Sequence, residues 1–152
     1  MAEFWIHGPI EVPCTRKRVS RIISKEDRAS FWCDNDSVAM KKGCYIFAFR
    51  AGRGTKPVYV GKATKSFRQE IFTHHKLSLY HSAFADQERG APVMFFVCLD
   101  YAKKPNRKAI RQVEIFLIGV AREANKDLLN VQHNQQTQWV IRVACSPKTQ
   151  PI

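Results

Sequence analysis

Short apolar runs alternate with amphipathic stretches along the chain, and their order predicts a small sheet covered by helices. The segment 44–49 is apolar and aromatic, the segment 58–60 follows it after a turn containing Gly52 and Gly54, and a third run spans 93–99. Runs of this length, rich in β-branched and aromatic residues and bounded by Gly or Pro, are typical of buried strands. Because a short glycine-containing loop joins the first two, we expect them to form a hairpin.

Helical periodicity occupies two further stretches of the sequence. Between Ser66 and Phe84, apolar residues recur three and four positions apart, which predicts a helix ending near His74 and a second helix after it. From Pro105 to Ala124 the same spacing predicts one long helix, and Asn125 suits its exit. The face of this helix that we expect to be buried consists of Ile110, Val113, Leu117, Val120, Ala121 and Ala124.

The two ends of the chain carry weaker signals. Residues 4–12 contain β-formers around a break at His7-Gly8-Pro9, which indicates either a weak strand or an ordered arm. Ser24 followed by two acids has the chemistry of a helix start, so we expect a short helix through Trp32. Residues 139–144 are suited to a final strand.

These elements predict one domain. A chain of 152 residues is long enough for one compact core and too short for two. The order of strands and helices predicts a single α/β domain with a small three- to four-stranded, mainly antiparallel sheet flanked by helices. We expect an N-terminal arm and short helix over residues 1–42, a core over 43–130, and a C-terminal strand and tail over 131–152.

The charge of the chain points to a polyanionic partner. Lys and Arg number 25 against 13 Asp and Glu, which gives a formal net charge of +12. Such a surplus on a small domain favours nucleic acid or an acidic membrane surface, with a merely soluble basic protein as the alternative. No apolar run approaches the roughly 20 residues that span a bilayer, so we expect no membrane partner.

The N-terminus and the cysteines bear on the cellular compartment. Glu3, His7 and Pro9 interrupt the apolar stretch that a signal peptide needs, so we expect no export. The five cysteines are an odd number without short paired spacing, and Cys44 and Cys98 lie inside apolar runs, where a buried thiol is usual. We therefore expect a cytoplasmic protein without a cysteine zinc site.

Two tripeptides give the chain its clearest motif. Gly43-Cys44-Tyr45 begins the first predicted strand, and Tyr59-Val60-Gly61 ends the second, followed by Lys62-Ala63. This pair resembles the Gly-Ile-Tyr and Tyr-Ile-Gly tripeptides that name the GIY-YIG endonuclease family. Cys replaces the usual Ile in the first, and Val is a common variant in the second. The resemblance covers the core, 43–130.

The same resemblance implies roles for further residues. His74 falls where many members of the family carry a histidine, and Glu114 falls where the family keeps its metal-binding glutamate. Asn130 matches the asparagine that closes the family's core, so that Asn130 and Gly61 are expected to support the structure. The implied cofactor is Mg²⁺ or Mn²⁺, held by Glu114.

Each of these residues also has an ordinary structural interpretation. Glu114 borders the predicted apolar face, where a carboxylate is costly unless it is paired or binds a cation, and a solvent-facing glutamate paired with Arg111 is the alternative. Tyr45 and Tyr59 suit a core, or a cleft in which a nearby Lys62 stabilises a phenolate that takes a proton from water. For His74 and His75, packing and a contact to phosphate are both open.

One position departs from the family pattern. The slot for the family's catalytic arginine, one turn before His74, is occupied by Glu70, and Arg68 lies half a turn earlier. A guanidinium there would clamp a phosphate with two parallel hydrogen bonds and stabilise the transition state. Because the two residues are two positions apart on a helix, only one of them can face the cleft.

The resulting expectation is a metal-dependent endonuclease that hydrolyses phosphodiester bonds. Glu114 would hold the ion, Tyr45 or Tyr59 assisted by Lys62 or His74 would activate water, and Arg68 would stabilise the developing charge. The resemblance favours DNA over RNA as the substrate. A homodimer is compatible with the sequence. A catalytically inactive nucleic-acid-binding module of the same fold is the main alternative, and a protein-interaction adaptor is the third.

Overall fold

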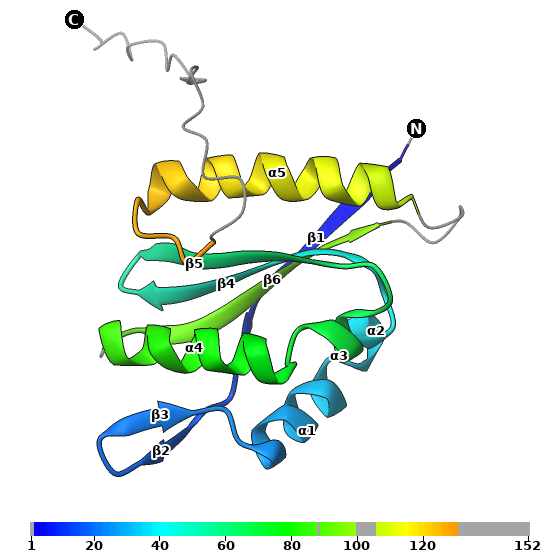
Figure 1. Cartoon of the computed structure of the whole chain (residues 1–152). Coiled ribbons are helices and arrows are strands. Elements are labelled where there is room, and N and C mark those ends of the chain that lie inside the picture. The colour runs from blue at the N-terminus through cyan, green and yellow to red at the C-terminus, as the bar shows by residue number, and fades with distance from the viewer. Residues whose placement is uncertain (1, 88, 100–105, 131–152) are drawn as a thin grey trace, which may run out of the picture.

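A four-stranded antiparallel sheet forms the centre of the computed structural model, which describes residues 2–87, 89–99 and 106–130 (Figure 1). The strands lie in the order β1-β6-β4-β5, and each is antiparallel to its neighbours. This confirms the predicted class, a single small α/β domain with an antiparallel sheet and helices. The strands are β1 (Phe4–Glu11), β4 (Gly43–Ala51), β5 (Gly54–Ala63) and β6 (Ala91–Leu99).

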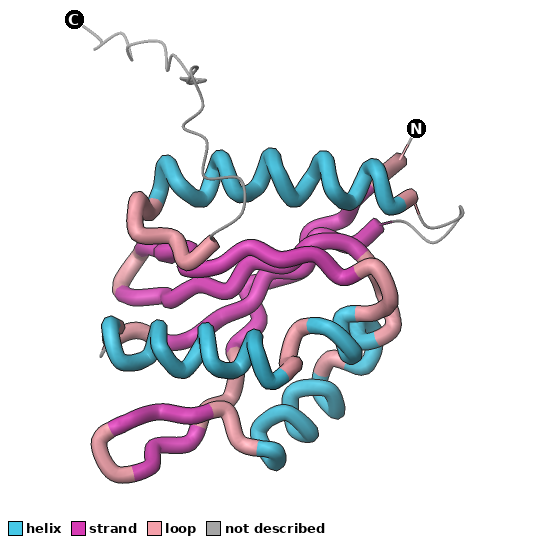
Figure 2. The backbone as a smooth tube through the Cα atoms, viewed as in Figure 1, coloured by secondary structure: helices cyan, strands magenta, loops and turns pink. Residues whose placement is uncertain are grey.

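Helices cover both faces of the sheet (Figure 2). One face is covered by α5 (Arg107–Ala124), which packs on β4 and β5. The other face carries the larger, aromatic-rich part of the core, which contains Phe31, Phe47 and Phe96. The helices on this side are α1 (Lys25–Asp34), α2 (Asp36–Ala39), α3 (Phe67–Glu70) and α4 (His74–Asp86). With both faces covered, β4 and β6 are apolar along almost their whole length.

The N-terminal segment is a strand of the main sheet. β1 pairs with β6 from Phe4 opposite Leu99 to Glu11 opposite Val93, with an irregularity between His7 and Ile10. Pro9 lies inside this irregularity and cannot donate a hydrogen bond, which is tolerated at the edge of a sheet. Of the two expectations for residues 4–12, the strand is therefore confirmed.

A second, two-stranded sheet follows β1. The hairpin consists of β2 (Thr15–Lys17) and β3 (Ser20–Ile22), which we did not predict. The helix expected after Ser24 is present as α1, and both halves of a capping box hold its start. The Ser24 hydroxyl accepts from the Asp27 amide at 3.1 Å, and the Asp27 carboxylate accepts from the Ser24 amide at 2.9 Å.

The two predicted helices between Ser66 and Phe84 are present, but their boundary differs. The first, α3, ends at Glu70, and the Thr73 hydroxyl caps a new helix by accepting from the Lys76 amide at 3.4 Å. His74 is therefore the first residue of α4, so the prediction that it lies near the end of the first helix is wrong. The Thr73 cap makes the difference, because it satisfies an amide at a helix start.

The buried face of α5 also differs from the prediction. Val120 is 52% exposed and Ala124 is exposed, whereas Ile118 and Glu114 are buried. The sheet contacts a narrow stripe that runs down the helix in steps of three and four residues from Ile110. Val113 and Leu117 lie at the border of this stripe and are partly buried, whereas Val120 and Ala124 face solvent. The predicted face was therefore wrong at its C-terminal end and lacked Ile118.

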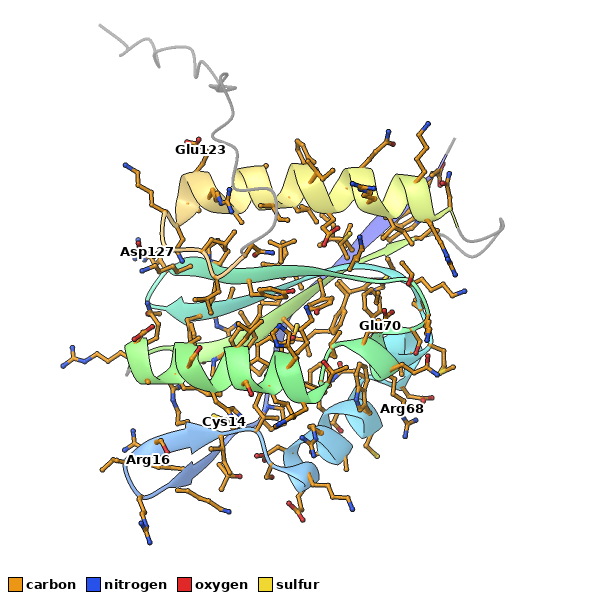
Figure 3. The ribbon with its side chains drawn as sticks, viewed as in Figure 1. Cys14, Arg16, Arg68, Glu70, Glu123 and Asp127 are labelled. Atoms are coloured by element: carbon orange, nitrogen blue, oxygen red, sulfur yellow. The ribbon has the colours of Figure 1, made fainter. Side chains whose placement is uncertain are left out.

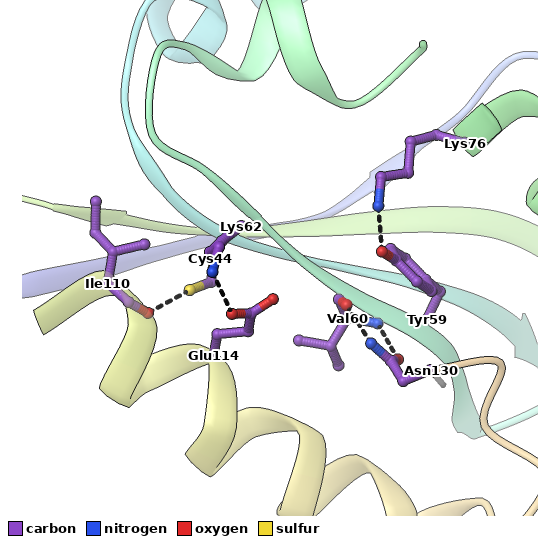
Figure 4. Close-up of polar contacts among 8 residues, drawn as sticks. All are labelled: Cys44, Tyr59, Val60, Lys62, Lys76, Ile110, Glu114 and Asn130. Carbon is purple, nitrogen blue, oxygen red and sulfur yellow. Dashed lines mark hydrogen bonds and ion pairs between the residues drawn. The ribbon is translucent and has the colours of Figure 1, made fainter. Parts of the chain in front are cut away.

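A segment after α5 closes the outer edge of β5. The Asn125 side chain donates to the carbonyl of Pro57 at 2.7 Å, and the Leu129 amide donates to the carbonyl of Val58 at 2.9 Å. The Asn130 side chain exchanges two hydrogen bonds with Val60, accepting from its amide at 2.9 Å and donating to its carbonyl at 2.6 Å (Figure 4). The expected strand at 139–144 lies outside the described residues. No helix in the described part of the chain is long and apolar enough to cross a membrane.

Candidate functional site

A buried carboxylate and a lysine meet where α5 crosses the end of β5 (Figure 4). Glu114 projects from α5 and is 6% exposed, and one of its oxygens, Oε2, lies 3.2 Å from the Nζ atom of Lys62. The Lys62 side chain is 40% exposed. No hydrogen bond from a described residue reaches Glu114 Oε2. The centre therefore combines an incompletely satisfied carboxylate with a cation that has access to solvent.

Backbone register explains why these two residues meet. Cys44 lies opposite Lys62 on the neighbouring strand, and the Cys44 thiol donates to the Ile110 carbonyl at 3.3 Å, one helical turn before Glu114. Burial, together with the charge of Glu114, raises the pKa of the Cys44 thiol to about 12, so this cysteine stays protonated and is no nucleophile. The alternative partner considered for Glu114, Arg111, is exposed, and the carboxylate is paired with Lys62 instead.

Glu114 fits a divalent ion as a single protein ligand. Mg²⁺ is commonly bound through one or two carboxylates, with waters and phosphate oxygens completing its shell. The Oε2 atom of Glu114, which is ion-paired with Lys62 but has no hydrogen bond, is a ligand atom of the right type, and within the described residues no group of three His, Cys, Asp or Glu side chains could form a closed metal cage. An ion at Glu114 would have to compete with the Lys62 ammonium for the same oxygen.

The two motif tyrosines, Tyr45 and Tyr59, lie on the opposite face of the sheet, which α3 and α4 cover. Side chains alternate along a strand, so Tyr59 and Lys62, three residues apart on β5, point to different faces. The Tyr59 hydroxyl is hydrogen-bonded to Lys76 Nζ, and this ammonium also lies 4.4 Å from the centre of the Tyr59 ring. Lys76 was not predicted, because its approach to Tyr59 depends on the Thr73 cap that starts α4.

Tyr45 is fully buried. Burial raises the pKa of its phenol well above the ordinary value, and the neighbouring Tyr80, Tyr59 and Glu70 add to this. The Tyr45 hydroxyl interacts with the neighbouring Tyr80 hydroxyl, which itself donates to the Ile71 carbonyl. A buried phenol of this kind is protonated at neutral pH and has no contact with solvent.

Close packing explains why glycine occupies these positions in the two tripeptides. Gly61 lies directly opposite Tyr45, and a Cβ atom there would overlap the end of the Tyr45 ring. Gly43 has a φ of +146°, and a Cβ atom there would overlap the Val97 carbonyl oxygen on β6. The second tripeptide thus makes room for the tyrosine of the first.

Of the two residues near the expected arginine slot, the acid is the less exposed. Glu70 is half-buried, accepts from the Lys65 amide at 2.9 Å, and acts electrostatically on Tyr45. Arg68 is exposed on α3 (Figure 3). His74 and His75 are exposed in the first turn of α4, and neither imidazole is hydrogen-bonded to a described residue.

Comparisons with known proteins leave the family open. No protein-family model, no curated protein and no solved structure matches the chain. Membership of the GIY-YIG family therefore stays a prediction from the two tripeptides and the residues aligned with them.

Replacing the two tyrosines by Phe is expected to separate packing from chemistry. Tyr45→Phe removes a buried hydroxyl that interacts with Tyr80, so we expect a loss of no more than about 1.5 kcal/mol of stability, with cleavage unchanged. Tyr59→Phe removes the contact to Lys76. If Tyr59 assists proton transfer, activity falls roughly 10²- to 10⁴-fold with little change in melting temperature. Thermal unfolding and initial rates, measured on both variants, check this. Normal cleavage by Tyr59→Phe would limit Tyr59 to packing.

The exposed Arg68 and half-buried Glu70 give a second paired test. Arg68→Ala removes a side chain that faces solvent, so we expect cleavage within about threefold of the wild type. Glu70→Gln weakens the hydrogen bond from the Lys65 amide, and we expect a loss of about 0.5–1.5 kcal/mol of stability. Urea unfolding and initial cleavage rates measure the two effects. A loss of about 3 kcal/mol in transition-state stabilisation with Arg68→Ala would instead show that Arg68 supplies the expected guanidinium.

Proposed function

We propose that this chain is a metal-dependent nucleic-acid phosphodiesterase whose reactive centre is formed by Glu114 and Lys62. The observation that carries the proposal is the buried Glu114 carboxylate, which keeps one oxygen without a hydrogen bond beside a half-exposed ammonium. A carboxylate buried in this way persists only if a cation compensates it. The net charge of +12 and the resemblance to GIY-YIG endonucleases favour a phosphate-bearing polymer as the substrate.

Within this proposal, Glu114 holds Mg²⁺ or Mn²⁺, which would supply a Lewis acid at the scissile phosphate. Lys62 is the nearest cation to that carboxylate, and its partly exposed side chain can turn from Glu114 to a phosphate oxygen. Asn130 and the segment before it hold β5, and with it Lys62, in place. Tyr59 and Lys76 lie on the other face of β5, away from Glu114, and with Arg68, His74 and His75 they remain candidates for phosphate contacts.

DNA is the proposed polymer. The arrangement uses no group that recognises a ribose 2′-hydroxyl, and the preference for DNA over RNA comes from the family resemblance alone. A homodimer and a cytoplasmic location stay predictions from the sequence.

A non-catalytic nucleic-acid-binding module is the second candidate. Two observations favour it: the Lys62 ammonium already neutralises Glu114, and of Arg68 and Glu70 on α3 the less exposed one is the acid. In this alternative the Glu114–Lys62 pair is a structural ion pair, and the surplus of Lys and Arg side chains binds the nucleic acid.

A cleavage assay separates the candidates. The purified chain is incubated with single-stranded DNA, duplex DNA and RNA in Mg²⁺, in Mn²⁺ and in EDTA, and binding is measured in parallel in EDTA. The proposal expects cleavage of DNA with either metal and none in EDTA. Binding without cleavage under every condition would support the non-catalytic nucleic-acid-binding module instead. If the chain neither binds nor cleaves nucleic acid, the protein-interaction adaptor is the remaining candidate.

A further inference from the structure

The hairpin formed by β2 and β3 lies away from α5, on the other side of the main sheet (Figure 1). It carries a concentrated positive charge outside the candidate centre. Residues 15–22 include Arg16, Lys17, Arg18 and Arg21 and no acid. Arg16 lies directly opposite Arg21 in the hairpin register. Like charges facing each other across two strands destabilise the pair unless other groups compensate them.

Three of these four charges are uncompensated. Arg16, Lys17 and Arg18 are exposed, and no ion pair or side-chain hydrogen bond joins them to the described residues. Arg18 has a φ of 55° in the tight turn, and Val19 beside it is 97% exposed, so the tip extends into solvent. The nearest acid at the base of the hairpin, Asp27, is already engaged by the Thr15 hydroxyl at 2.8 Å and by the Ser24 amide.

The fourth charge, Arg21, anchors the hairpin to the body. Its guanidinium donates to the carbonyls of Gly90 and Gln87 at 2.7 and 2.5 Å. It also lies 5.0 Å from the centre of the Phe84 ring and 5.6 Å from that of Phe49. These contacts lock Arg21 against the end of α4 and the core.

A second contact holds the strand that leaves the hairpin. The Ile23 amide donates to His81 Nε2 of α4 at 3.0 Å, and burial, together with the charge of Arg28, lowers the pKa of His81. A neutral imidazole is the form that can accept this hydrogen bond. The hairpin is thus fixed at its base by β3, while Arg16, Lys17 and Arg18 are exposed on β2 and in the turn.

We propose that this hairpin is a phosphate-contacting ribbon that holds duplex nucleic acid, an inference that rests on the proposed function. Arg and Lys side chains contact the phosphate backbone without reading sequence. A two-stranded ribbon fits the major groove of B-DNA, which is about 12 Å wide. Arg16, Lys17 and Arg18 then supply contacts that orient the duplex, and the anchored Arg21 sets the direction of the ribbon.

The test compares two triple variants with equal net charge. One is Arg16→Gln with Lys17→Gln and Arg18→Gln. The control is Arg53→Gln with Lys56→Gln and Lys126→Gln, which removes three exposed charges from the β4–β5 turn, β5 and the segment after α5. Binding of each to a duplex, a single strand and vesicles containing anionic lipid is measured over a range of salt concentrations, in EDTA, with melting temperatures for folding.

The hairpin variant is expected to bind the duplex roughly ten- to a hundredfold more weakly, with a log–log salt slope shallower by about 2–3, as for three lost phosphate contacts. The control is expected to stay close to wild type. Equal losses in both variants, or a loss for vesicles without one for duplex, would overturn the proposal. Binding is measured in EDTA and does not depend on cleavage. If the wild type binds duplex through the hairpin but does not cleave it, only the proposed catalytic function is contradicted.

Discussion

Glu114→Gln is expected to abolish metal-dependent cleavage while the chain stays folded and keeps much of its affinity for nucleic acid. The amide preserves the shape of the side chain but loses the charge that would hold the ion and that now attracts Lys62 at 3.2 Å. Removing several kcal/mol of transition-state stabilisation corresponds to a fall of at least about a hundredfold in rate. Initial rates across a series of Mg²⁺ and Mn²⁺ concentrations measure the effect.

A matched control lies on the same helix. Glu123 is exposed near the end of α5 (Figure 3), so Glu123→Gln makes the same chemical change away from Lys62 and should cleave at the wild-type rate. A melting temperature and a binding curve in EDTA separate lost chemistry from lost folding. Cleavage by Glu114→Gln at a rate near wild type would remove Glu114 from the reaction and leave it as the partner of a structural ion pair.

Gly43→Ala is expected to be the most destabilising single change in the sheet. Gly43 combines a φ of +146°, which side-chain-bearing residues rarely adopt, with backbone of β6 in the space that a Cβ atom would fill. Strain at such a position costs about 1–3 kcal/mol, and overpacking against a fixed backbone adds about 1–3 kcal/mol. We therefore expect a loss of about 2–6 kcal/mol in the free energy of unfolding, measured with urea.

Gly119→Ala is the matched comparison. Nothing lies within 4 Å of a Cβ atom at Gly119, which is in α5, so the same substitution should stabilise the chain by up to about 1 kcal/mol through helix propensity. If Gly43→Ala costs less than about 1 kcal/mol, β4 and β6 can shift apart at this point. The packing reason for the first tripeptide's glycine would then be wrong.

Local patterns in the sequence carry most of the fold. The apolar segment 44–49 and the run at 93–99 are buried strands because helices cover both of their faces, and burial on both faces leaves a continuous apolar run that is readable without a structure. The capped helix after Ser24 was also predictable, because the cap is formed by residues only three positions apart in the sequence. The β2–β3 hairpin could not be predicted, because Arg21 holds it through Gln87 and Gly90, far away in sequence.

The candidate site was predictable as residue types and not as an arrangement. Glu114 and Lys62 were each singled out, but their meeting depends on the register that sets Lys62 opposite Cys44 and on where α5 crosses β5. The contact between Lys76 and Tyr59 depends on a helix boundary that shifted by a few residues. Long-range placement of this kind leaves no periodic signal in the sequence.

The hydrogen bonds between residues 125–130 and β5 affect whether a further strand can pair with this edge of the sheet. An open strand offers unpaired amides and carbonyls to any extended chain, and natural proteins block such edges to avoid unwanted association. Here, side chains and backbone of the Asn125–Asn130 segment already occupy groups of Pro57, Val58 and Val60 that a visiting strand would need. At the opposite edge of the sheet, β1 has a break at Gly8 and Pro9 that limits the length that can pair. The segment after α5 therefore blocks extension of the sheet along β5 from Pro57 to Val60.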